Sequence, residues 1–237
     1  MVQIYPGVTI PPGITISSGP PVPPTPSLAL SLDAAGYTSG PWVDTVSGFS
    51  FTLYNGVSYS SDGGGSLQFV PGSSQYAECT TSLSSLNTWT IETWHYYAGG
   101  NVGTHPTIVT EVYEVGSSIN YALGSTDSSS PVLDTGFYNG DWRSTFGGYS
   151  LTAGYWYQIV GTYDGSTIKL YVNSILTRQR VYTYAPTSSN QGIRLMRRWD
   201  LANYWGGKLA IVKIFQDALS QEEVEAAWNA NKARFGL

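Results

Sequence analysis

The sequence predicts an all-β protein in which antiparallel strands form a jelly-roll sandwich, with one short C-terminal helix and an extended Pro-rich N-terminal arm. The stretch 156–173 carries the first signal, because apolar and polar residues alternate on both sides of Asp164-Gly165. That alternation is typical of a half-buried β-hairpin closed by a tight turn. The composition agrees: only 11% of the 237 residues are charged, whereas 14% are aromatic and 27 are glycines. Such a composition favours pleated sheets joined by turns.

Residues 1–26 differ from the rest of the chain and are predicted to form a separate arm. They contain eight of the 13 prolines, and no charged side chain precedes Asp33. A flexible linker is one interpretation of this composition. We favour a docking or strand-adding arm that binds other proteins of an assembly or copies of the same chain, so that a homo-oligomer is expected. The apolar residues of the arm, which lie in two Pro-Gly-X-Thr-Ile repeats without any neighbouring charge, are Val8, Ile10, Ile14 and Ile16. Residues 20–26 then serve as a stiff polyproline spacer.

Residues 27–237 are predicted to form the sandwich domain. A hairpin is expected around Asn55-Gly56, because this dipeptide favours a two-residue turn. Further strands are predicted at 67–69, 89–94, 108–115, 156–163, 167–173 and 209–215. The helix begins after Ser220, which forms a capping box with Glu223. Its apolar face is expected to contain Val224, Ala227 and Trp228.

Charge and cysteine content exclude several classes of function. The net charge of −5 argues against nucleic-acid binding, which requires a basic surface. No apolar run is long enough for membrane insertion, and the N-terminus lacks the pattern of a signal peptide. The single Cys79 cannot form an intrachain disulfide, and no Cys/His spacing indicates structural zinc.

Several motifs together resemble laminin-G-like domains of the concanavalin A-like lectin/glucanase superfamily, of the kind found in bacteriophage virion proteins. The motifs, which cover roughly residues 28 to 235, are Leu32-Asp33-Ala34, the segments 42–48 and 65–69, Trp89–Trp94, the hairpin turn 163–165, and 207–215 with Ala218-Leu219-Ser220. The chain departs from the family pattern at Ser174, where glycine is usual, and at Val70-Pro71-Gly72, where an acidic residue is usual.

The resemblance implies a concanavalin A-like jelly roll in a non-enzymatic virion structural protein. Its location would be the virion surface, as a capsid decoration protein, a fibre protein or a tail-associated adhesin, and its partners would be other virion proteins. The displayed domain would then attach to a surface or to a cell-surface glycan. A free carbohydrate-binding lectin is the alternative, and a glycoside hydrolase is a third.

Hydrolysis of a glycosidic bond requires two facing carboxylates. The strand that carries them in related hydrolases offers only Glu92 here, with Thr90 and Trp94 as its same-face neighbours, and we therefore expect Glu92 to be structural. Glu111 and Glu114 differ by three positions, so in a strand they point to opposite faces. The two histidines, His95 and His105, are expected at the surface or in structural hydrogen bonds. The sequence thus indicates no enzyme.

No cofactor is required by the residue pattern, but the resemblance makes Ca²⁺ a candidate ligand. Members of the superfamily often hold calcium in loops through carboxylates and carbonyl oxygens. The candidate ligands in this chain are Asp33, Asp44 and Asp62.

Aromatic residues in polar, loop-like segments are the candidates for ligand binding. A ring can stack on a sugar face while neighbouring polar groups bond the hydroxyls, although aromatic and Arg residues are also favoured at protein interfaces and in ordinary packing. The first group comprises Tyr138, Asn139, Asp141, Trp142 and Arg143. The second group comprises Arg198, Trp199, Asp200, Asn203, Tyr204 and Trp205. Trp89, Trp94, Trp156 and Trp228 are instead expected in the core.

Overall fold

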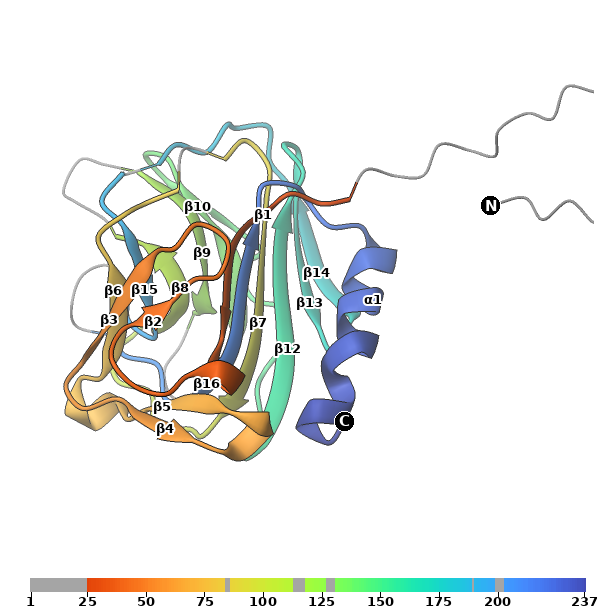
Figure 1. Cartoon of the computed structure of the whole chain (residues 1–237). Coiled ribbons are helices and arrows are strands. Elements are labelled where there is room, and N and C mark those ends of the chain that lie inside the picture. The colour runs from red at the N-terminus through yellow and green to blue at the C-terminus, as the bar shows by residue number, and fades with distance from the viewer. Residues whose placement is uncertain (1–24, 84–85, 113–117, 127–130, 189, 199–202) are drawn as a thin grey trace, which may run out of the picture.

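The computed structural model describes residues 25–83, 86–112, 118–126, 131–188, 190–198 and 203–237. These residues form a sandwich of two antiparallel sheets that face each other across a common core, with one α-helix against the outside (Figure 1). The predicted all-β sandwich with a short C-terminal helix is therefore confirmed. The predicted arm falls almost entirely on residues 1–24, which lie outside the described residues, so its docking role stays a prediction.

Within the described part of the chain, each sheet contains eight strands. The first sheet has the order β14 (Ile175–Val181), β13 (Thr167–Val172), β12 (Tyr155–Tyr163), β7 (Trp89–Tyr97), β16 (Gly207–Phe215), β5 (Ser66–Phe69), β4 (Ser58–Ser60), and β1 (Leu28–Asp33) also pairs with β16. The second sheet has the order β11 (Trp142–Ser144), β10 (Leu133–Tyr138), β9 (Ile119–Ser125), β8 (Thr107–Glu111), β15 (Ile193–Leu195), β6 (Tyr76–Cys79), β3 (Ser50–Tyr54), β2 (Trp42–Val43). Single 3₁₀ turns occupy Ala34–Gly36, Asp62–Gly64, Pro71–Ser73 and Lys232–Phe235.

The hairpin predicted at Asp164-Gly165 is confirmed as β12 and β13. Ile159 pairs with Val172 and Tyr163 with Ile168, so each strand presents alternate residues to the core. The Asp164 carboxylate closes the turn, because its Oδ1 accepts the backbone N–H of Ser166 at 2.8 Å. Asp and Gly were therefore reliable turn signals here.

The hairpin predicted at Asn55-Gly56 is wrong, although the turn itself exists. Asn55 and Gly56 both have positive φ, of 62° and 80°. However, β3 before the turn pairs with β2 and β6 in the second sheet, whereas β4 after it pairs with β5 in the first sheet. The Gln75 side chain donates to the carbonyl oxygens of both turn residues, at 3.0 and 2.9 Å. The dipeptide therefore carries the chain from one sheet to the other.

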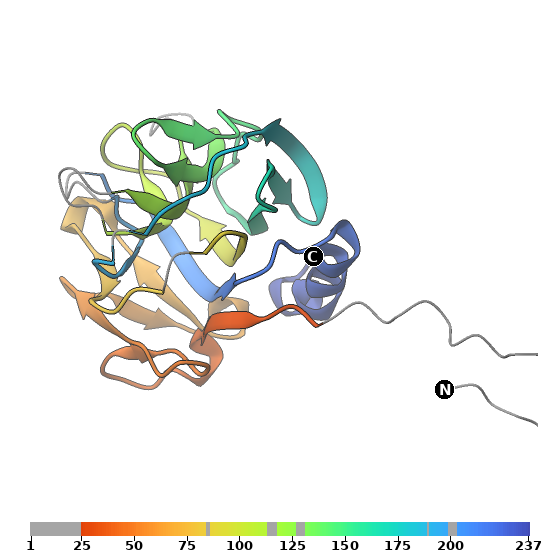
Figure 2. The ribbon, with the colours of Figure 1, turned by 90° about the horizontal axis from the view of Figure 1, so that it is seen from above.

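The helix α1 (Gln221–Asn231) covers the outer face of the first sheet, the face directed away from the core (Figures 1 and 2). Its predicted capping box is confirmed, because Ser220 accepts the N–H of Glu223 while the Glu223 carboxylate accepts the N–H of Ser220. Val224 is fully buried, and Trp228 stacks on Trp94 with ring centroids 5.4 Å apart. Trp89 and Trp94 are fully buried as expected, whereas Trp156 and Trp228 are only half-buried.

None of the helices in the described residues combines the length and the apolar composition that a membrane span requires.

Candidate functional site

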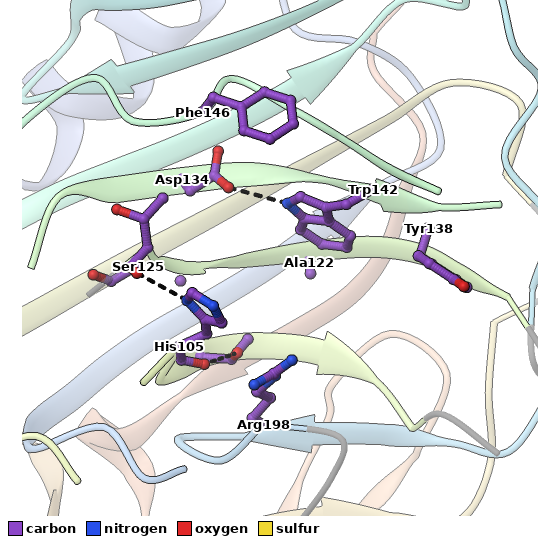
Figure 3. A pocket seen from close by; sticks show the side chains of 11 residues that line it. His105, Ala122, Ser125, Asp134, Tyr138, Trp142, Phe146 and Arg198 are labelled. Carbon is purple, nitrogen blue, oxygen red and sulfur yellow. Dashed lines mark hydrogen bonds between the residues drawn. The ribbon is translucent and has the colours of Figure 1, made fainter. Parts of the chain in front are cut away.

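A pocket of about 460 Å³ lies on the outer face of the second sheet, over β8 to β11 (Figure 3). The alternation of side chains in β9 and β10 creates this face. Leu123 and Leu133 belong to the hydrophobic core, whereas their neighbours Ala122, Gly124 and Asp134 line the pocket. Because Ala122 and Gly124 have small side chains or none, the space over this face of β9 stays open and forms the pocket.

Trp142 forms one wall of this pocket, which we call the Trp142 pocket. Its indole Nε1–H donates to Asp134 Oδ2 at 3.1 Å (Figure 3). The other carboxylate oxygen of Asp134, Oδ1, accepts the hydroxyl of Thr145 at 2.8 Å. Asp134 itself is only 6% exposed, so it anchors the indole from below. A half-buried ring that is fixed in this way presents a rigid apolar surface.

His105 and Arg198 face this wall from the other side of the pocket (Figure 3). His105 Nδ1 lies 2.8 Å from the carbonyl oxygen of Thr126. Because a carbonyl oxygen only accepts, Nδ1 is the donor of this hydrogen bond, and the bond fixes the orientation of the ring. Arg198 is held in place by its backbone N–H, which donates to the Asn203 carbonyl at 2.8 Å. The pocket therefore combines an apolar wall with a few polar groups around its rim.

Among the described residues that line the pocket, Asp134 is the one carboxylate. Both of its oxygens accept hydrogen bonds from the protein. Glu111 is fully buried, and its Oε2 accepts the Asn120 N–H at 2.6 Å while Oε1 accepts the Ser188 hydroxyl. Glu114 lies outside the described residues. The lining thus lacks the facing pair of carboxylates that a glycosidase requires.

Glu92 lies on the other sheet, beneath α1, and its structural role is confirmed. It is fully buried, and its Oε1 accepts both the indole N–H of Trp94 and the side-chain amide of Gln158 at 3.0 Å. His95 is also structural: Nε2 accepts the Trp205 indole N–H at 2.9 Å. Burial lowers the pKa of His95 to about 3, so this ring is neutral at physiological pH.

The structure divides the first group of predicted binding residues. Tyr138 and Trp142 line the pocket. Asn139 and Asp141 lie exposed in the turn between β10 and β11, and Asn139 Nδ2 donates to the Ala185 carbonyl at 3.0 Å. Arg143 points elsewhere, because it pairs with Asp141 and places its guanidinium 4.5 Å from the ring centre of Tyr184.

The second group is also divided, and two of its members are corrected. Trp205 is fully buried, and its indole N–H is consumed by His95, so the ring is core rather than a ligand contact. Asn203 is 4% exposed, and its Oδ1 accepts the backbone N–H of Thr104. Arg198 lines the pocket, whereas Tyr204 is half-buried and lies near Tyr76 and Arg197 instead. Trp199 and Asp200 lie outside the described residues.

Sequence reasoning did not predict the other eight residues that line the pocket, which are His105, Thr107, Ala122, Gly124, Ser125, Thr126, Asp134 and Phe146. Asp134 carried one readable signal, because it is a lone acid within the apolar segment 131–137. Phe146 carried none, although the structure gives it a positive φ of 49° and leaves 51% of it exposed.

The three candidate calcium ligands do not form a shared site. Asp44 is 2% exposed, and its carboxylate accepts the backbone N–H groups of Ser31, Val46 and Ser47. Asp33 pairs with Arg234 and Asp62 with Lys208. Across the described ranges, no three His, Cys, Asp or Glu side chains lie close enough together to hold a metal ion. Each aspartate instead stabilises a turn or an ion pair, and calcium binding elsewhere stays a prediction.

Comparison with known proteins places this geometry in a family context. Residues 71–225 match the family model described as the concanavalin A-like lectin/glucanases superfamily. No curated protein sequence matches the chain.

Solved structures share the fold at low sequence identity. Domain 4 of AbnA, a GH43 extracellular arabinanase from Geobacillus stearothermophilus solved in complex with arabinotriose, is 15% identical with a TM-score of 0.66, over 85% of this chain and 98% of that one. The receptor-binding domain of botulinum neurotoxin type G is 16% identical with a TM-score of 0.63, over 86% of this chain. A sialidase from Trypanosoma rangeli, in complex with the inhibitor DANA, is 12% identical with a TM-score of 0.62, over 86% of this chain. This chain covers 51% of the neurotoxin domain and 33% of the sialidase.

Proposed function

Because the chain belongs to the concanavalin A-like lectin/glucanase superfamily, we propose that its sandwich domain is a non-enzymatic glycan-binding module and that the Trp142 pocket is its binding site. The observation that carries this proposal is the indole of Trp142, which Asp134 fixes over a pocket large enough for a sugar ring. A rigid aromatic wall with a few fixed polar groups is how shallow polar ligands are oriented. The arabinotriose bound to domain 4 of the arabinanase is consistent with this use of the fold.

In this proposal each part of the pocket has a role. Trp142 stacks against the apolar face of a sugar, and Phe146, which is 51% exposed, adds a second aromatic ring to the lining. His105 Nε2 is the ring nitrogen available for a hydrogen bond with a sugar hydroxyl, while Arg198 donates to a ring or hydroxyl oxygen. Asp134 acts as a positioning residue, because it holds the indole rather than the ligand.

A glycan array that compares the wild-type protein with Trp142→Ala, Asp134→Asn and Tyr59→Ala tests the proposal. Tyr59 is the matched control, because it is 47% exposed but lies on β4 of the other sheet. Wild type and the Tyr59 variant should bind the same glycans, whereas Trp142→Ala should lose at least tenfold in affinity. Asp134→Asn should weaken binding less, because an amide oxygen still accepts the indole N–H. Equal binding by Trp142→Ala and wild type would refute the site.

Incubation of each bound glycan with the protein, followed by an assay for new reducing ends, tests the non-enzymatic part. We expect no release of sugar, because the described lining contains a single, fully engaged carboxylate. Release by wild type would contradict this part of the proposal and leave the binding site intact.

We further propose that residues 1–26 anchor the module to an assembly, namely the surface of a virion, through contacts with other virion proteins or with copies of the chain. The uncharged apolar residues Val8, Ile10, Ile14 and Ile16 support an anchoring role, since exposed apolar segments favour burial against a partner. Light scattering of the full chain with these four residues changed to Asp tests the copy-to-copy contact. The control variant places Asp at Thr9, Thr15, Ser17 and Ser18, so that the added charge is equal. The anchor would be supported if wild type and the control variant are oligomeric while the variant with Asp at the four apolar positions is monomeric.

A further inference from the structure

The outer face of the second sheet carries a second cluster of side chains, separate from the Trp142 pocket. Beyond β15 the backbone of residues 196–198 pairs with 203–205: Arg197 and Tyr204 form a bridge, and Arg198 N–H donates to the Asn203 carbonyl. Arg198 lines the Trp142 pocket, whereas Arg197 lies over Tyr76 of β6. In the sheet, β15 lies between β8 and β6. The segment after β15 therefore separates the part of this face over β8 from the part over β6.

Arg197 is a buried cation without a carboxylate partner in the described residues. The residue is 7% exposed, and its guanidinium carbon lies 4.2 Å from the ring centre of Tyr76 and 5.5 Å from that of Tyr204. The Nε–H of Arg197 is buried with no acceptor. The ion pairs of the described ranges involve Arg143, Arg194, Lys208 and Arg234 instead. Buried charges in proteins are normally paired, because leaving water without a counter-charge is costly.

Among the described residues, the acid that β6 places on this face, Glu78, is already engaged. Glu78 Oε2 accepts Arg194 Nε at 2.6 Å, and both residues are largely buried. Arg194 and Glu78 thus neutralise each other, and within the described ranges no carboxylate pairs with Arg197. This local excess of positive charge stands out in a chain whose net charge is −5.

Aromatic rings surround the Arg197 guanidinium. Tyr54 stacks on Tyr76 with ring centroids 4.4 Å apart and an angle of 5° between the planes, and Arg197 lies over the same Tyr76 ring. Burial raises the pKa of the Tyr76 phenol, and the nearby positive charge of Arg197 opposes that rise. A hydrogen bond from the Arg197 side chain to the phenol also opposes the rise. A guanidinium carries five N–H donors in one plane, and the Nε–H of Arg197 is one that has no acceptor.

In-plane donors on a guanidinium match the two oxygens of a carboxylate or sulfate, which accept two parallel N–H bonds. We propose that Arg197 forms an anion subsite, so that the protein recognises acidic glycans, which carry a carboxylate or a sulfate, in preference to neutral ones. This inference rests on the proposed glycan-binding function. Arg197 and Arg198 are consecutive in the chain. One oligosaccharide can therefore place one sugar in the Trp142 pocket and the acidic group of a neighbouring sugar at Arg197.

A glycan array that pairs each acidic glycan with its neutral counterpart tests the preference. Wild type should bind the acidic member at least tenfold more strongly, and the difference should shrink as salt is raised, because screening weakens the ion pair. Arg197→Gln should lose the preference, and Arg197→Lys should retain only part of it because a lysine lacks the planar pair of donors. Arg178→Gln is the matched control, since it removes one positive charge from the exposed strand β14. Preferential binding of neutral glycans, or a preference that Arg197→Gln keeps, would overturn the inference.

A second measurement separates the anion subsite from the glycan-binding function. The midpoint of thermal unfolding is recorded in sodium glucuronate and in sodium chloride of equal ionic strength, since a ligand that binds the folded state raises it. Glucuronate should raise the midpoint of wild type and of Arg178→Gln but leave Arg197→Gln unchanged. If this holds while the array shows no bound glycan, the proposed function fails and the subsite stands. If neutral glycans bind and glucuronate has no effect, the function stands and the subsite fails.

Discussion

Acidification should destabilise this protein through His95, a fully buried residue that contacts Trp205 in the core shared by the two sheets. The ring is fully buried, and its Nε2 accepts the indole N–H of Trp205 at 2.9 Å. Burial disfavours the charged imidazolium, and this desolvation lowers the pKa of His95 from 6.5 to about 3. In the unfolded chain the same side chain titrates with its ordinary pKa.

The sign of the effect follows from the two pKa values. Below pH 6.5 the unfolded state binds a proton that the folded state refuses, so the free energy of unfolding falls as the pH falls. The contribution is fully present above pH 6.5 and is lost progressively down to about pH 3. Each pH unit in this window corresponds to about 1.4 kcal/mol. At pH 4.5, two units below the unfolded pKa, the loss is therefore about 2.7 kcal/mol.

Urea unfolding of wild type and His95→Gln at pH 7.5 and pH 4.5 measures this loss. Glutamine does not titrate, and its amide oxygen can still accept the Trp205 indole N–H. The carboxylates and the exposed His105 contribute equally to both proteins, so they cancel in the comparison. Wild type should lose about 2.7 kcal/mol more than the variant between the two pH values. Equal losses would refute the reasoning, as would an NMR titration in which His95 takes up a proton near pH 6.

Three further predictions concern the stability of the fold. Ser174→Gly should raise the free energy of unfolding by about 1 kcal/mol, because Ser174 has a φ of 65° that glycine adopts without strain; urea unfolding checks this, and a loss of stability would contradict it. Ser220→Ala should cost about 1 kcal/mol, since it removes the N-cap of α1; an unchanged urea midpoint would show that the cap is dispensable. Gly161→Ala should cost about 1–3 kcal/mol, because an added Cβ would lie 2.2 Å from Thr135 Oγ1. The double variant with Thr135→Ala should recover part of that loss, and strictly additive losses would argue against the contact.

The residues that sequence reasoning placed correctly act over short distances along the chain. Asp164 closes its turn by binding Ser166 and Thr167, and Ser220 caps its helix by binding Glu223. Glu92 was recognised as structural because it lacked a second acid on its own strand. Ser174 was noted as a departure from the family pattern, and its φ explains why glycine is usual there.

The errors arose where the partner of a segment is distant in sequence. Asn55-Gly56 adopts the expected turn, but its two flanking strands pair in different sheets. Trp205 stands among polar residues in the sequence, yet it packs beside His95, 110 positions away, and is fully buried. The alternation of apolar and polar residues near each segment predicts neither the pairing of β3 and β4 nor the contact between Trp205 and His95.

Neighbouring residues were enough to predict the sandwich class, the β12–β13 hairpin and the capped helix, because turn chemistry, side-chain period and helix capping act over a few positions. The position of the Trp142 pocket depends on the tertiary fold. The residues that line this pocket are spread along the chain between positions 105 and 198. They meet only because antiparallel pairing sets β8, β9, β10 and β11 side by side. The period of a strand shows that alternate residues share a face, but it does not show which face the core covers or what the neighbouring strand brings to the other.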